Sequence, residues 1–242
     1  KRCYFFIFGV LKSSSAEIPK CLPAEGPCIS KTINDILRRY PKGNPEFGLQ
    51  PVDSVHIDHL SVPGRPGNSP IHLNIEFDNL TAYGIEAATI ERVVGFEKDP
   101  SKSKFEVYGI IPDFKMEGNY ELNGKMLLLP INGKGKSKIY LKNLKIGVKV
   151  QVSESRRDGK LYINADKILS TVQTDLLQVD FENLLGENKE VGASINKVIN
   201  ENWREVFVEL EDSIAKAVAA VTKQLLSAVL AKLPYDDFFR EE

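Results

Sequence analysis

The side chains in this sequence best suited to acid–base catalysis or metal binding are three histidines, His56, His59 and His72. His56 and His59 are three residues apart in a segment whose alternating pattern predicts a β-strand. On a strand, odd spacing places two side chains on opposite faces, whereas the same spacing on a helix brings them to one face. We therefore expect exposed strand histidines that do not share a metal ion.

A second candidate for chemistry is Gly135-Lys136-Ser137, which has the order of residues that ends a phosphate-binding loop. That loop requires a glycine at position 130, where this chain has Pro130, and it leads from a strand into a helix. Here the segment lies between two predicted strands, so we interpret it as a hairpin turn with solvated lysines. The sequence has no Gly-x-Ser-x-Gly motif either. None of these patterns predicts an enzyme.

Three cysteines, Cys3, Cys21 and Cys28, remain. Cys3 lies in the apolar stretch 3–11, which follows two basic residues and precedes the small residues 13–16. A basic start, a short apolar run and small residues at a cleavage point are typical of a secretory signal peptide. The alternative is an apolar N-terminal strand. We interpret residues 1–16 as the remnant of a signal peptide and residues 17–242 as one domain.

Removal of residues 1–16 leaves Cys21 and Cys28, and an even number of cysteines in an exported chain predicts a disulfide. The alternative, two free buried thiols, applies if the chain is not exported. Export also gives meaning to Asn79-Leu80-Thr81, a sequon for N-glycosylation at Asn79 that lies in a predicted strand. The sequence thus predicts an extracellular protein with a small disulfide loop at the start of its fold.

The composition is that of an ordinary soluble globular protein, with 42% hydrophobic and 27% charged residues. It excludes a disordered, collagenous or membrane-spanning chain. The net charge is −1, and the basic residues are spread through the chain, so the sequence offers no basic field for nucleic acid. A chain of 242 residues has ample core to fold without a metal or another cofactor.

Hydrophobic periodicity divides the chain into a short helix, a long series of strands and a long helix. Ser30 is a suitable N-cap for a helix that ends before Pro41. From Val55 the period changes to two, which is typical of half-buried strands. The strand pattern continues through 71–78, 104–111, 114–122, 125–131, 138–152, 160–168 and 172–181. Asn123-Gly124, Asn132-Gly133 and Asp158-Gly159 suit tight hairpin turns between them. Such long strands predict a twisted, strongly curved and mostly antiparallel sheet.

Residues 189–233 have a helical pattern with an apolar face and many alanines on the other faces. We expect a break near Asn200-Glu201-Asn202, because one helix of this length would be too long for a compact domain. Lys216, Lys223 and Lys232 mark the solvent side and argue against a membrane span, and Pro234 ends the helix. The narrow, apolar helix is suited to lie inside the curve of the sheet.

Several stretches together resemble the insect takeout and haemolymph juvenile hormone binding protein family. One is the Cys21…Cys28 loop followed by a short helix, and another is the connector 45–53. The most specific stretch runs from Gly118-Asn119-Tyr120 through Leu128-Leu129-Pro130 to Gly135. Residues 200–207 and 234–236 complete the similarity, which covers about 18–239.

The resemblance implies an α+β fold of the takeout and TULIP-like type: a curved antiparallel sheet wrapped around a long C-terminal helix, with a short N-terminal helix. It also implies a hydrophobic tunnel between sheet and helix that holds a lipid-like ligand. The hormone carriers proper have a second disulfide, but here no cysteine follows Cys28. The missing second disulfide makes the chain more similar to the takeout branch than to the hormone carriers. The ligand can therefore be juvenile hormone, another terpenoid, a fatty acid or a fatty acid ester.

The implied function is a secreted, monomeric carrier of a small hydrophobic ligand, with no cofactor, no nucleic-acid partner and no stable membrane insertion. The alternative is a secreted interaction module with a filled core that acts on a receptor or another carrier. We expect the tunnel to be lined by apolar side chains and by the hydroxyl of Tyr120, although plain core packing would give the same sequence. The candidate lining residues are Phe77, Phe105, Val107, Phe114, Tyr120, Leu127, Leu129, Ile139, Leu141, Phe207, Leu210 and Ile214.

Overall fold

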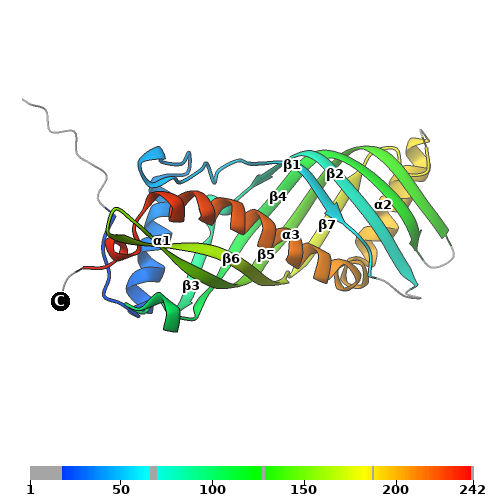
Figure 1. The fold of residues 1–242 in the computed structure, drawn as a ribbon. Coiled ribbons are helices and arrows are strands. Elements are labelled where there is room, and N and C mark those ends of the chain that lie inside the picture. The colour runs from blue at the N-terminus through cyan, green and yellow to red at the C-terminus, as the bar shows by residue number, and fades with distance from the viewer. Residues whose placement is uncertain (1–17, 66–69, 127–128, 187, 241–242) are drawn as a thin grey trace, which may run out of the picture.

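The computed structural model describes residues 18–65, 70–126, 129–186 and 188–240. The signal peptide expected at residues 1–16 and the candidate residue Leu127 lie outside the described residues. A long antiparallel sheet curves behind the C-terminal helix, with one short helix at each end of the molecule (Figure 1). This arrangement confirms the α+β fold that the sequence predicts.

The helices are α1 (Gly26–Arg39), α2 (Lys189–Glu201) and α3 (Trp203–Lys232). The strands are β1 (Val55–Val62), β2 (Ile71–Tyr83), β3 (Thr89–Val94), β4 (Phe105–Met126), β5 (Leu129–Arg157), β6 (Lys160–Gln173) and β7 (Leu176–Phe181). In the described residues the order is β1-β2-β4-β5-β6, while β3 also pairs with β4 and β7 with β5. Each long central strand therefore pairs along one edge with two shorter strands: β4 with β2 and β3, and β5 with β6 and β7.

The two central strands are longer than predicted, at 22 residues for β4 and 29 for β5. Asn123-Gly124 and Asn132-Gly133 lie within these strands, and Asn123 pairs with Asn132, so the prediction of turns there was wrong. Gly135-Lys136-Ser137 also lies within β5 and is not a turn. Only the third predicted turn is confirmed, since Asp158 and Gly159 have φ values of 52° and 78° between β5 and β6.

These glycines serve close contacts across the sheet. A Cβ atom on Gly124 would lie 2.1 Å from the carbonyl oxygen of His72. One on Gly133 would lie 2.6 Å from the hydroxyl oxygen of Tyr120. Glycine in a strand is typical of such close approach as well as of turns, and the sequence alone does not separate the two uses.

Two asparagines in left-handed conformation bend the sheet. Asn79 in β2 has a φ of 51°, and the pairing of β2 with β4 shifts between Asp78 and Thr81. Asn143 in β5 has a φ of 48° and donates a hydrogen bond to Asp175, which lies between β6 and β7. Asparagine tolerates this conformation better than most residues. Irregularities of this kind increase local twist and curvature, so they help the sheet to curve around α3.

Helix α1 begins at Gly26, four residues before the predicted cap at Ser30. Pro27 suits the first turn of a helix, and Ser30 is buried within it. The predicted disulfide is confirmed, with an Sγ–Sγ distance of 2.06 Å between Cys21 and Cys28. The carbonyl oxygen of Cys21 also accepts a hydrogen bond from the amide of Arg240 at 3.0 Å. The disulfide loop therefore connects the start of the fold with its end.

The predicted break between the two C-terminal helices is confirmed at Asn202, and α3 ends before Pro234 as expected. On one side α3 is bonded to β6, where Ser170 donates to the carbonyl of Ala215 and Lys223 donates to that of Asp166. On the other side Ser213 donates to the carbonyl of Pro63, just after β1, at 2.6 Å. The helix thus spans the opening between the two ends of the strand order.

Asparagine side chains on the short helices pair with strand edges. Asn196 accepts from the amide of Phe181 at 3.0 Å and donates to its carbonyl at 2.9 Å. One turn later, Asn200 makes the same two bonds with Val179 at 2.8 and 2.9 Å. Asn34 of α1 pairs in the same way with Ile90 of β3. These amides satisfy backbone groups that an open strand edge would otherwise expose.

We predict that Asn196→Ala lowers the free energy of unfolding by about 2 kcal/mol, because it leaves a part-buried amide and carbonyl of β7 without partners. The control is Ser194→Ala on the exposed side of the same helix, where a change below about 0.5 kcal/mol is expected. Chemical denaturation measures both. Equal effects of the two substitutions would show that Asn196 does not cap the strand.

Candidate functional site

Eight of the twelve candidate lining residues lie together in one hydrophobic cluster between the sheet and the C-terminal helices. Five of them are buried, namely Phe77, Tyr120, Leu141, Phe207 and Leu210. The other three, Phe114, Ile139 and Ile214, are partly buried and pack against the same cluster. The structure therefore brings together side chains from β2, β4, β5 and α3 that are far apart in the sequence.

The remaining candidates lie elsewhere. Phe105 belongs to a separate aromatic cluster, and Val107 is half-buried two residues further along β4. Leu129 pairs with Met126 and so shares its face of the sheet, but it lies at the end of β5 and is 43% exposed. Met126 and Ile131 are the buried residues in this part of the sheet. Leu129 therefore does not contribute to an enclosed surface, because the sheet ends beside it.

The hydroxyl of Tyr120, which we expected to face a ligand, is bonded to the protein. It donates to the backbone carbonyl of Glu182, and the ring packs on Phe181 at a centroid distance of 4.5 Å. Burial raises the pKa of Tyr120 to about 12. The side chain thus closes the sheet end near α2, and its donor hydrogen is used within the fold.

An aromatic cluster closes the other end of the fold, near α1. Tyr235 is fully buried and donates to the carbonyl of Glu97 at 2.6 Å. Its ring makes edge contacts with Phe105 at 6.1 Å and Phe239 at 5.1 Å, and Phe96 packs on Phe105 at 4.9 Å. Burial raises the pKa of the Tyr235 hydroxyl. Phe96 and Phe239 were not among the predicted site residues, since isolated aromatics outside the long strands and helices carry no periodic signal.

Between these two closed ends, α3 has an unusual distribution of exposure. Residues 211–232 are all described, and none of them is fully buried. One face is exposed and carries small or polar side chains: Asp212, Lys216, Ala220, Lys223, Ser227 and Ala231. The opposite face of α3 carries larger apolar side chains: Ile214, Val218, Val221, Leu225 and Val229. These face away from the solvent side and yet are only half-buried.

The strands of the cluster that Ile214 and Val218 join show the same property. Phe114 and Met116 of β4 and Ile139 and Ile146 of β5 pack toward the core from central strands, and all four are only partly buried. We refer to these four residues and the five inward residues of α3 as the inner surface. In a close-packed interior such positions would be almost fully buried. Only Phe114, Ile139 and Ile214 were predicted; the others carry the apolar periodicity that also indicates plain core.

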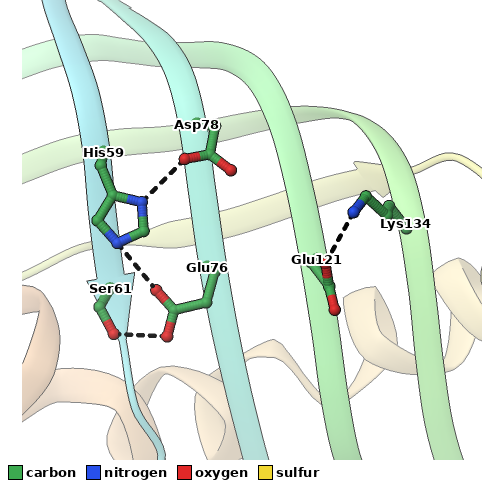
Figure 2. Close-up of polar contacts among 6 residues, drawn as sticks. All are labelled: His59, Ser61, Glu76, Asp78, Glu121 and Lys134. Atoms are coloured by element: carbon green, nitrogen blue, oxygen red, sulfur yellow. Dashed lines mark hydrogen bonds and ion pairs between the residues drawn. The ribbon is translucent and has the colours of Figure 1, made fainter.

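The histidines of β1 lie on the outer side of the sheet. His56 and His59 are both exposed, so the prediction that they occupy opposite faces was wrong. The alternation of β1 changes at Asp58, because Ile57 and Leu60 are the residues that pack toward the core and the left-handed Asn79 lies across from this point. His59 contacts two carboxylates of β2, those of Asp78 and Glu76 (Figure 2). Among the described residues no group of three or more His, Cys, Asp or Glu side chains is arranged to hold a metal ion.

Comparison with known proteins agrees with this architecture over nearly the whole chain. The model of the family described as haemolymph juvenile hormone binding protein (JHBP) matches residues 3–240. The chain belongs to the JHBP family. Members of this family are carriers of small hydrophobic ligands.

Individual members of the JHBP family are similar at moderate identity. The circadian clock-controlled protein daywake of Drosophila yakuba and that of Drosophila melanogaster are each 22% identical over 228 residues, covering 93% of this chain and 88% of theirs. The crystal structure of Epiphyas postvittana Takeout 1 superposes with a TM-score of 0.78 at 25% identity, covering 92% of this chain and 99% of that one. The predicted resemblance to takeout proteins is therefore confirmed.

Within this JHBP fold, α3 is as long and as apolar as a membrane-spanning helix. Its 30 residues are long and apolar enough, by length and composition alone, to cross a membrane, with a mean hydropathy of 1.5 over the most apolar window. Lys216, Lys223 and Lys232 therefore do not by themselves exclude a membrane-spanning helix. In this structure the helix is instead bonded to β6 and to the segment after β1.

We predict that Tyr120→Phe lowers the free energy of unfolding by about 1–2 kcal/mol, because the carbonyl of Glu182 loses its donor. Ligand affinity should stay unchanged, since the hydroxyl is used within the fold. Tyr83→Phe is the matched control, because Tyr83 is 38% exposed. Denaturation and ligand titration test both variants, and a loss of affinity without a loss of stability would assign Tyr120 to the ligand.

Proposed function

We propose that this protein is a secreted carrier that holds one elongated hydrophobic molecule between α3 and the sheet. A terpenoid such as juvenile hormone, or a fatty acid or its ester, has the required shape and polarity. Membership of the JHBP family supports the carrier function. The alternative, an interaction module with a filled core, uses the same fold without internal space.

The inner surface is the observation that favours the carrier. Its nine side chains are apolar, and each keeps part of its area accessible. Ile214 and Val218 of α3 pack against the same cluster as the four strand residues. Space between the inward face of the helix and the inward face of the central strands would account for this partial exposure. An apolar ligand in that space removes this area from water. At about 25 cal/mol/Å², burial of about 300 Å² of ligand surface gives about 7.5 kcal/mol before the costs of association.

The chemistry of the inner surface restricts the ligand. The nine residues carry no charge, so an ionised group placed among them would be desolvated without a partner. A neutral chain or ring system fits, with any polar group near an end of the site. The ends are defined by Tyr120 and Phe181 on one side and by the Tyr235 cluster on the other. A preformed apolar site with few polar groups is typical of small-molecule carriers.

Secretion is supported by three separate features. Residues 1–16 have the pattern of a signal peptide. The Cys21–Cys28 disulfide is of a kind that persists in oxidising compartments. Asn79 of the sequon is exposed on the outer side of β2, where a glycan would project into solvent.

We predict that Val218→Trp weakens binding of a fluorescent fatty acid at least tenfold, about 1.4 kcal/mol, because the indole occupies the ligand's position. Its stability should change by less than about 1 kcal/mol, since the site has room. Ala220→Trp, on the exposed face of the same helix, should leave affinity unchanged. Displacement titration and chemical denaturation measure these effects. In a filled core, Val218→Trp would instead cost about 1–3 kcal/mol through overpacking, and no fatty acid would bind to the unmodified protein.

A further prediction concerns export. When the full-length precursor is expressed in insect cells, we expect the protein in the medium with a glycan at Asn79. Mass spectrometry before and after enzymatic deglycosylation should show the loss of one N-glycan, and Thr81→Ala should abolish that change. Retention of the protein inside the cells would contradict the assignment of secretion.

A further inference from the structure

His59 lies between two carboxylates of the neighbouring strand. Its Nδ1 is 2.9 Å from Oδ1 of Asp78, and its Nε2 is 3.4 Å from Oε2 of Glu76 (Figure 2). Ser61, two residues further along β1, donates to Oε1 of Glu76 at 2.7 Å. Oε2 of Glu76 is buried and has no hydrogen-bond partner among the described residues. The imidazole therefore faces one carboxylate with each ring nitrogen.

The other charged groups near His59 make this arrangement dependent on a proton. Glu121 of β4 lies directly opposite Glu76, and like charges in that position repel. Lys134 of β5 binds Glu121 at 3.0 Å and so offsets one of the three carboxylates. On β1 itself, Asp58 is paired with His56. Helix α3 packs on the opposite, inner side of the strand, through Leu60 and Ile57 and the core they join.

A protonated imidazole donates its Nδ1 hydrogen to Asp78 and places its positive charge beside Oε2 of Glu76, 3.4 Å from Nε2. A neutral imidazole has one donor, so one carboxylate then faces a lone pair instead. Both carboxylates belong to β2, whereas His59 belongs to β1, the first strand in the sheet order. The proton on His59 thus adds an electrostatic attraction between an edge strand and the rest of the sheet.

We propose that protonated His59 is a clamp that holds the edge strand β1 on β2, and that the clamp opens as the pH rises. β1 and the Pro63 carbonyl that follows it form the border of the sheet along α3. Loosening β1 would therefore ease exchange of a molecule held against the inner surface. The effect on exchange rests on the proposed carrier function, whereas the clamp itself does not.

The direction of the pH dependence follows from the titration of His59. The hydrogen bond to Asp78, with the charges of Asp78 and Glu76, raises the pKa of His59 above its usual value of 6.5. A raised pKa in the folded state gives stability that is fully present below pH 6.5 and is lost as the pH rises through the folded value. β1 should be held most firmly at mildly acidic pH.

The test is hydrogen exchange of the β1 amides in the ligand-free protein at pH 6 and pH 8.5, expressed as protection factors corrected for the intrinsic rate. In the unmodified protein we expect protection of β1 to fall about two- to tenfold relative to β6. His59→Gln should remove this difference, because glutamine does not titrate. His56→Gln should retain it, because His56 has similar exposure on the same strand but pairs with Asp58 of β1 itself. NMR titration should place the pKa of His59 above 6.5 in the folded protein.

Equal pH dependence of β1 protection in His59→Gln and the unmodified protein would overturn the clamp, as would a pKa of His59 at or below 6.5. Release of a bound fluorescent fatty acid is then measured at the same two pH values. Faster release at pH 8.5 in the unmodified protein, but not in His59→Gln, is expected. Failure of the fatty acid to bind at all would count against the carrier function. The hydrogen-exchange test of the clamp would be unaffected.

Discussion

The fold depends on the partial enclosure of α3 by a sheet that contacts it along its sides. A helix of 30 residues with apolar side chains on most of its faces needs an enclosure. Here the enclosure is bonded to the helix through Ser170 and Ala215 on one side and through Ser213 and Pro63 on the other. The middle of the inner face is left half-buried. The apolar character that makes the helix need an enclosure therefore also supplies the surface that we propose for a ligand.

The rest of the molecule keeps this enclosure in shape. Asn79 and Asn143 provide irregular points at which long strands bend. Backbone groups at the free edges of β3 and β7 are hydrogen-bonded by the side chains of Asn34, Asn196 and Asn200. The two ends are packed solidly, by Tyr120 with Phe181 and by the cluster around Tyr235. The disulfide loop stabilises the end around Tyr235, since the carbonyl of Cys21 accepts a hydrogen bond from the amide of Arg240.

Much of this architecture could be predicted from periodicity. Alternation gave the strands, the long apolar pattern gave α3, and the break at Asn202 followed from the length of the helix. The Asn-Gly pairs at 123–124 and 132–133 were misassigned, because glycine serves close strand contacts as well as turns. The faces of β1 could not be predicted either, since they depend on Asn79 in another strand. The half-buried inner surface had no signal of its own, because apolar residues that line a space and apolar residues that fill a core have the same periodicity.

The central claim is that space for a ligand lies between α3 and the sheet. A crystal structure of the protein purified from insect-cell medium, without added ligand, tests it most directly. The account predicts continuous elongated density between Val218 and Ile139, with the side chains of both residues in contact with it. Direct packing of the inward side chains of α3 against β4 and β5, with neither density nor unfilled volume between them, would contradict it.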